Sequence, residues 1–367
     1  MNSESDNRRI DRTEIIMPPK QSLFRQFWTK RIPHILGIYL GITWGIIESM
    51  DWLVNRYILS PYLIDFALVL LLSMVPTVLL LAYYHGKPGP DEWTKVEKIG
   101  IPINVLLSAV ILFLVFGGKE LGAITEKVKL TDETGHIVER VVPKSGFCEK
   151  TAVFFFKNES NDSTLDWLQY GISLGIWFDL KQDIFIAPYS GYFFIDKMRK
   201  AGFMNGVDIP VALMQKISAE SNFKHFVFGA FTKKNTNFHI AAYIYDTKYG
   251  RPMAEHIFIG KNIFALIDEI TIWFKHNARM PEQHTSSTKD LPVSEITSSS
   301  LNAFQLYILG NNAIEFNNDW NSAQTYFEQS VESDSTFARA FLQLALVNME
   351  LGHKENAENA IHMAMKY

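Results

Sequence analysis

Three stretches rich in apolar residues lie in the first third of the chain, at 35–53, 62–84 and 99–116. Each is close to the ~20 residues that a membrane-spanning helix needs. Short polar joins separate them, and no stretch of that kind follows Phe116. The pattern predicts three transmembrane helices within residues 34–118, after a leader of residues 1–33. A cleaved signal peptide does not fit a leader of this length with no small-residue cleavage site after the first stretch.

The basic residues around these stretches predict an orientation. Seven Lys or Arg residues precede the first stretch, one lies in the first connection and three lie in the second. Because cytoplasmic loops carry the excess of Lys and Arg, the amino terminus is expected in the cytoplasm. Three crossings then place the soluble domains on the far side of the membrane. Pro102 lies near the start of the third stretch, and if that stretch did not cross, the soluble body would be cytoplasmic instead.

Two carboxylates, Glu48 and Asp51, lie in the first stretch and three residues apart, so a helix places them on one face. Carboxylates within a membrane are functional candidates by default. The alternative is an interfacial position, which Trp52 and Arg56 favour. An ion path would need polar partners from the other two stretches, which offer few: Asp65, Ser73, Thr77, Asn104 and Ser108. The interfacial interpretation is therefore preferred.

After the third apolar stretch, the hydrophobic pattern changes from continuous apolar runs to an alternation of polar and apolar residues. Polar and apolar residues alternate over 126–130 and 137–142, on either side of an Asp-Glu-Thr-Gly turn, which predicts a β-hairpin within a linker of residues 119–148. Residues 149–280 mix strand and helix patterns and predict an α/β domain. Its expected strands start at Thr151 and cover 184–187, 223–232, 237–245 and 253–259, and its expected helices cover 165–180, 193–200, 210–221 and 263–276.

Residues 281–299 are rich in Ser, Thr and Pro and predict a linker. A repeat of 34 residues follows in 300–367, in which Ala323, Phe327 and Ser330 recur as Ala357, Ile361 and Ala364, with Gly310 and Ala345 ahead of the two sets. Small, large and small residues at this spacing are typical of tetratricopeptide repeats, in which small residues let two helices approach closely. Ser330, Ser335 and a longer loop at 317–319 depart from the pattern, and an unrelated pair of helical hairpins is the alternative.

The order of these parts resembles a bacterial family of membrane-anchored proteins with a TolB-like amino-terminal α/β domain followed by tetratricopeptide repeats. With three crossings, this resemblance implies a bacterial inner-membrane protein with its soluble domains in the periplasm. The motifs that carry the resemblance are Ala-Val-Phe-Phe-Phe-Lys-Asn-Glu-Ser-Asn-Asp at 152–162 and Trp-Leu-Gln-Tyr-Gly-Ile at 167–172. The family's DNA-binding, cyclase or kinase modules have no room in the leader. Two repeats are fewer than a solenoid normally needs, so a partner at the open end or a longer chain is expected.

Composition excludes several classes of function. The 367 residues carry a net charge of −4, with basic and acidic residues interleaved, so a nucleic-acid surface is not expected. The single Cys148 excludes an intramolecular disulfide and a cysteine-based metal site. No cofactor is expected either. The predicted fold class is a membrane α region, an α/β domain and an all-α repeat region.

Catalytic chemistry has no clear candidates among the residues, since no nucleophile with a base, carboxylate pair or ligand cluster stands out. The best polar cluster is Asn158, Ser160 and Asp162, which could cap the next helix or bind a ligand at its amino terminus. A cap and turn is the simpler interpretation. The sequence therefore favours a non-enzymatic interaction or scaffold protein with protein partners and the lipid bilayer. The alternatives are an envelope ligand sensor and an accessory subunit of a larger membrane complex.

Overall fold

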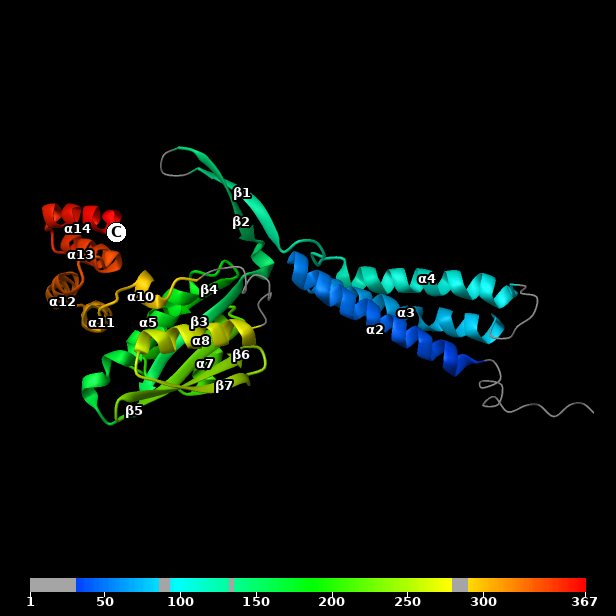
Figure 1. The fold of residues 1–367 in the computed structure, drawn as a ribbon, viewed down its shortest axis with the longest axis horizontal. Coiled ribbons are helices and arrows are strands. Elements are labelled where there is room, and N and C mark those ends of the chain that lie inside the picture. The colour runs from blue at the N-terminus through cyan, green and yellow to red at the C-terminus, as the bar shows by residue number, and fades with distance from the viewer. Residues whose placement is uncertain (1–30, 86–92, 132–134, 279–289) are drawn as a thin grey trace, which may run out of the picture. The chain divides into compact units, whose positions relative to one another are not determined.

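The computed structural model describes residues 31–85, 93–131, 135–278 and 290–367. They form two compact units, Met1–Gly122 and Ala123–Tyr367 (Figure 1). Most of the expected leader, the tip of the expected hairpin turn and part of the expected linker lie outside the described residues. So do residues 86–92 of the second basic connection.

The first unit consists of three long helices, α2 (Ile32–Tyr57), α3 (Tyr62–His85) and α4 (Lys95–Phe116). α2 packs on α3, and α3 packs on α4. The hydroxyl of Tyr39 on α2 donates to the carbonyl of Leu71 on α3 at 2.5 Å. Thr94 caps α4, because its hydroxyl accepts from the Glu97 backbone N–H while the Glu97 carboxylate accepts from the Thr94 N–H.

Two of these helices, α3 and α4, are long and apolar enough to cross a membrane. The expectation of three spans is therefore wrong by this measure. α2 has the length but not the composition, because Gly37, Gly41 and Gly45 add little hydropathy and Glu48 and Asp51 lower it. With two crossings the expected periplasmic location of the soluble domains loses its premise, since an even number of crossings returns the chain to its starting side.

Side chains of α4 supply hydrogen bonds beside a proline in α3. Pro76 has no backbone N–H and cannot donate to the carbonyl of Leu72, four residues earlier. One residue further on, the Ser73 carbonyl accepts from Asn104 Nδ2 at 3.0 Å and from Ser108 Oγ at 3.3 Å. Asn104 Nδ2 also donates to Thr77 Oγ1 at 2.9 Å. The polar residues of α3 and α4 thus bond to one another.

The second unit begins with an antiparallel hairpin of β1 (Thr125–Thr131) and β2 (Ile137–Pro143), as the alternation predicts. A separate five-stranded sheet follows, in the order β4-β3-β5-β6-β7. Its strands are β3 (Glu149–Asn158), β4 (Ile186–Ser190), β5 (His225–Lys234), β6 (Asn237–Asp246) and β7 (Arg251–Gly260). β3 pairs in parallel with both β4 and β5, and β5, β6 and β7 form an antiparallel meander.

Two helices, α5 (Trp167–Leu180) and α8 (Ile263–Asn277), cover one face of this sheet (Figure 1). They touch closely at Gly175, where an added Cβ would lie 2.7 Å from Ile267 Cδ1. Asn262 caps α8 by accepting from the backbone N–H of Phe264. The other face is only partly covered, by a 3-10 turn (Gly191–Phe194) and by α6 (Ile195–Lys200) and α7 (Val211–Glu220).

The chain continues through α10 (Val293–Ile296) into two helical hairpins. These are α11 (Leu301–Asn317) with α12 (Trp320–Ser333), and α13 (Ala338–Glu350) with α14 (Lys354–Lys366). α11 packs directly on α5, with the Phe304 ring 6.4 Å from Trp167 and 5.4 Å from Phe264. Arg339 on α13 lies 4.3 Å above the Phe178 ring. The hairpins and the sheet domain therefore form one body.

Candidate functional site

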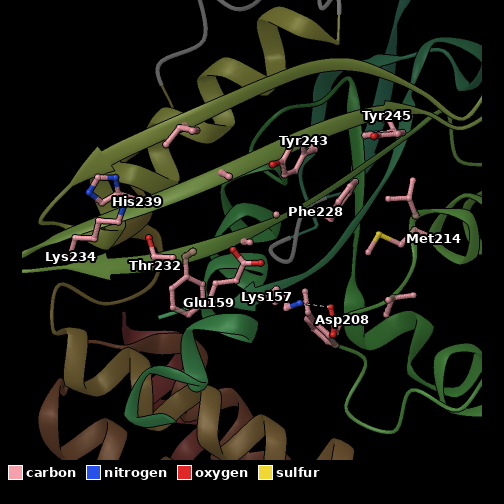
Figure 2. Close-up of a pocket in the computed structure, with 18 residues that line it drawn as sticks. Lys157, Glu159, Asp208, Met214, Phe228, Thr232, Lys234, His239, Tyr243 and Tyr245 are labelled. Atoms are coloured by element: carbon pink, nitrogen blue, oxygen red, sulfur yellow. Dashed lines mark ion pairs between the residues drawn. The ribbon is translucent and has the colours of Figure 1, made fainter. Parts of the chain in front are cut away.

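The uncovered face of the sheet forms a pocket of about 540 Å³ across β5, β6 and β7 (Figure 2). Ala230 on β5 and Ala241 on β6 are paired in register, and Ile257 is the next residue along that row on β7. Because these two side chains are small, the middle of the sheet face is recessed between the larger side chains on either side. The pocket is therefore a consequence of small residues at matched positions on neighbouring strands.

Aromatic rings form one end of the pocket. Phe228 and Tyr243 are paired in register, and their rings stack with centroids 5.3 Å apart and planes 24° apart. Tyr245 adds a third ring 5.5 Å from Phe228. Met214 of α7 also lines this part of the pocket. Partly exposed aromatic rings of this kind offer a flat apolar surface with hydroxyl groups at its edge.

Polar side chains lie along the other end and the rim. Thr232 and His239 are paired in register, and Lys234 lies beyond them on β5. Lys157 of β3 forms an ion pair with Asp208 at 2.9 Å, which Figure 2 shows beside the pocket. The Asp208 carboxylate raises the pKa of the Lys157 ammonium above its usual value. Both signs of charge are therefore present at the rim, and neither dominates it.

This arrangement is suited to binding. The floor and the aromatic end can hold apolar groups, and the rim can donate or accept hydrogen bonds. In the part of the chain that the structure describes, no group of three or more His, Cys, Asp or Glu residues is placed to hold a metal ion.

The loop that contains Asn158, Ser160 and Asp162 uses its polar groups internally. Asn158 Oδ1 accepts from both the backbone N–H and the hydroxyl of Ser160, and Asn158 Nδ2 donates to the Asp162 carbonyl at 2.9 Å. Asp162 Oδ1 accepts from the Thr164 backbone N–H and hydroxyl, and the Thr164 hydroxyl lowers the pKa of the Asp162 carboxyl. This geometry describes a cap and a turn at the start of the η2 turn (Ser163–Leu165).

The repeat-packing residues do not all lie at equivalent depths. Gly310 faces Phe327 so closely that an added Cβ would lie 2.6 Å from its ring. The predicted small residues Ala323, Ala345 and Ala357 are buried. Ile361, the counterpart of the fully buried Phe327, is 38% exposed, and Ala364 is partly exposed. The difference has a simple cause, because no described element lies beyond α14 to cover its outer side.

The remaining candidate residues do not line the pocket. Glu48 and Asp51 are exposed on α2, and Asp51 accepts a hydrogen bond from Asn55 at 3.3 Å. Cys148 is a free, partly exposed thiol just before β3, and burial raises its pKa.

Sequence reasoning missed the sheet-face pocket, although a signal for it exists. Residues 239, 241, 243 and 245 of β6 are His, Ala, Tyr and Tyr, and residues 238, 240, 242 and 244 are apolar. A strand with one fully apolar set and one mixed aromatic and polar set has one face in a core and another at a binding surface. The pairing of Ala230 with Ala241 could not be found in this way, because it depends on the register between strands.

No protein-family model matches this chain, and no curated protein matches it. Solved structures that resemble it include the LpoB C-terminal domain from Salmonella enterica, at 7% identity and a TM-score of 0.24, covering 31% of this chain and 83% of that one. TolB from Acinetobacter baumannii is 10% identical with a TM-score of 0.25, covering 42% of this chain and 31% of that one. The LpoB C-terminal domain from Escherichia coli is 8% identical with a TM-score of 0.24, covering 31% and 83%.

LpoB and TolB are thus weak structural neighbours of this chain. TM-scores this low do not establish a shared fold or function. The family resemblance of the sequence, with its TolB-like domain and tetratricopeptide repeats, stays a prediction.

Proposed function

We propose that this chain is a membrane-anchored, non-enzymatic interaction protein of the bacterial envelope, which holds other proteins through its sheet domain and helical hairpins. The observation that carries the proposal is the uncovered sheet face. A monomer that needed only stability would cover this face as α5 and α8 cover the opposite one. Instead Ile257 and Ile259, which pair in register with Ala241 and His239 of the pocket face, are 60% and 56% exposed. Exposed apolar surface of this extent is typical of interaction sites.

A second surface supports the same function. Leu342, Leu346 and Met349 lie at positions i, i+4 and i+7 of α13 and are 53%, 46% and 61% exposed. This spacing places them in one row on the helix. Helical repeats bind partners through surfaces of stacked helices, and an exposed apolar row suits that use. The apolar helices α3 and α4 support anchoring in a bilayer, for which the inner membrane is proposed.

In-cell photo-crosslinking tests this proposal. A photoreactive amino acid is placed at Ile257 in the full chain, with a matched position at Glu328, which is exposed on α12. We expect one defined protein to crosslink from Ile257 and not from Glu328, and Tyr243→Ala to reduce its yield. If Ile257 crosslinks no protein, or crosslinks the same set as Glu328, the sheet face is not an interaction site and the proposal fails.

The pocket volume favours a second candidate, a sensor that binds a small ligand. A cavity of about 540 Å³ lies within the ~300–1,000 Å³ that ligand pockets occupy. A thermal-shift screen of the full chain in detergent separates the two functions. A small molecule that raises the melting temperature of the wild type but not of Ala241→Leu, which fills the floor, would favour the sensor.

A further inference from the structure

The two edges of the five-stranded sheet differ in a way that indicates a use for one of them. Edge strands carry unpaired backbone groups, and natural proteins usually block them with short strands, prolines, charges or covering side chains. β4, at one edge, has five residues and contains Pro188. The Trp177 indole N–H donates to the Pro188 carbonyl at 2.9 Å and so occupies one of its outer groups. The β4 edge is blocked.

β7, at the other edge, is ten residues long and remains open. Pro252 lies near its start, opposite the register shift at Ile244 and Tyr245, and residues 253–260 contain no Pro or Lys. Among the described residues, no strand pairs with the outer edge of β7. No backbone hydrogen bond joins that edge to any other described residue. A second chain could therefore form a ladder along residues 253–260.

Both faces of the sheet are apolar beside this edge. On the pocket face, Ile257 and Ile259 are more than half exposed, and Met253 is 36% exposed. On the helix face, the His256 ring lies 4.7 Å from Phe258 and 6.4 Å from Trp273 of α8. A strand added here would find apolar neighbours for its side chains on both sides, which an isolated edge ladder does not offer.

A charge on the edge limits the choice of partner. Glu255 is exposed on the pocket face, in register with Tyr243, and it has no ion-pair partner among the described residues. A Lys or Arg on the neighbouring strand would pair with it, whereas a like charge would be repelled.

In the two same-face registers with the greatest overlap, a second copy of β7 brings like charges together. With the pocket faces on the same side, one central antiparallel register places Glu255 opposite Glu255, and the next places Arg251 opposite Lys261. A strand of another protein with a basic residue at this position fits better.

We propose that β7 accepts an extended segment of a partner protein as a sixth strand of the sheet, with apolar side chains at alternate positions and a Lys or Arg beside Glu255. This rests on the proposed function and names its mode of recognition. Backbone hydrogen bonds from the β7 edge hold the segment, and the apolar and charged neighbours select its sequence.

The test uses the full chain in detergent micelles and nine-residue fluorescent peptides. Each peptide alternates Ile or Val with Thr. At the central position of the Ile and Val set, it carries Lys or Glu instead. Because the N–H groups of successive residues in a strand point to opposite sides, two sets of N-methylated peptides separate strand addition from adsorption. Methylation of one alternate set should weaken binding by about tenfold or more, and methylation of the other set by less than about twofold.

Glu255→Lys supplies the second measurement. We expect the wild type to prefer the Lys peptide and Glu255→Lys to prefer the Glu peptide, with unchanged melting temperature. Met204→Lys, at a site 64% exposed between α6 and α7, is the matched control and should keep the wild-type preference. Equal weakening by both methylated sets, no reversal by Glu255→Lys, no binding of any peptide, or self-association of the chain through β7 in sedimentation would each overturn the proposal.

The two proposals fail in different ways. If Ile257 still crosslinks a defined protein in cells while the peptides show no alternate pattern, the interaction function stands and strand addition is wrong. If the peptides bind with the alternate pattern while no protein crosslinks in cells, the mode of binding stands and the cellular function is wrong.

Discussion

Apolar side chains point outward in the helices of the first unit and inward in the second unit. Leu106, Phe113 and Leu114 on α4 are 69%, 74% and 77% exposed, whereas Phe304 and Phe327 of the helical hairpins are fully buried. Two polar side chains of α4 show the reverse arrangement. Asn104 and Ser108 lie between α3 and α4, where they bond to Ser73 and Thr77.

This difference in which side chains face outward indicates that different forces stabilise the two units. In water, burying apolar area is the main source of stability, and the second unit follows this rule. Lipid tails are as apolar as Leu, so helices in a membrane associate through close packing and hydrogen bonds instead. The outward apolar surface of α3 and α4 is thus suited to lipid, and the outward apolar surface of β7 and α13 is suited to protein.

Truncating a large side chain in each unit tests this contrast with the largest expected effect. Phe327→Ala removes a ring enclosed by Gly310 and by Tyr307, whose ring centroid is 5.7 Å away. We expect a loss of about 3–5 kcal/mol in unfolding free energy, measured by chemical denaturation of the full chain in micelles. Phe113→Ala, the control on the outer surface of α4, should change stability far less. Equal losses would mean that the outward side chains of α4 are buried in the folded protein.

A buried carboxylate gives the second unit a pH dependence. Asp179 is 3% exposed, and burial raises its pKa to about 6, although the hydroxyl of Thr271 donates to it. In the unfolded chain the pKa of the Asp179 carboxyl is about 3.8. The stability that the protonated Asp179 gives the folded protein is therefore fully present below pH 3.8 and is lost as the pH rises through about 6.

Asp179→Asn removes this dependence. Its amide can still accept the hydrogen bond that Gln182 Nε2 donates at 2.7 Å. Relative to the wild type, we expect the variant to gain about 1–3 kcal/mol between pH 4 and pH 7. Melting curves at several pH values measure the gain. A constant difference between the two proteins across that range would contradict the raised pKa.

Much of the element order could be predicted from the sequence, because periodicity is a local signal. The alternation over 237–245 predicts β6, and the helical spacing over 165–180 predicts α5, which starts at Trp167. The three-span prediction failed because α2 has the length of a span, whereas its glycines and carboxylates lower its hydropathy.

The pocket and the two edges could not be predicted in this way. They depend on strand order and register, and the parallel pairing of β3 with β4 and β5 joins segments far apart in the sequence. The contact of Phe304 with Trp167 also joins segments far apart in the sequence. For this reason, the sequence pattern alone predicts the helical hairpins as a separate domain.

The hydrogen bonds between α3 and α4 should contribute less than a buried ring. Asn104→Leu removes the donor to Ser73 and Thr77, and we expect a loss of about 0.6–2 kcal/mol in micelles. Leu106→Ala, on the exposed surface of α4, is the control for a change of side-chain size. Thermal unfolding followed by circular dichroism compares the two variants. If Leu106→Ala were the more harmful, packing rather than hydrogen bonding would hold these helices together.

The smallest effect is expected at the rim of the pocket. Lys157 and Asp208 form an ion pair, but their side chains are 45% and 69% exposed. Exposed pairs contribute little, because water and salt screen the charges, so Lys157→Met should change stability by less than about 1 kcal/mol.

A buried lysine provides the contrast. Lys275 is 3% exposed and lies 3.7 Å from Asp183, with Asp290 as a closer partner. Lys275→Met leaves the buried Asp183 carboxylate and the partly exposed Asp290 carboxylate without this cation, and it should cost about 3–5 kcal/mol. Chemical denaturation at low and high salt measures both variants. A loss at Lys157 that matched the loss at Lys275 and persisted in high salt would show that the rim pair is enclosed, and that the pocket face is covered rather than open to a partner.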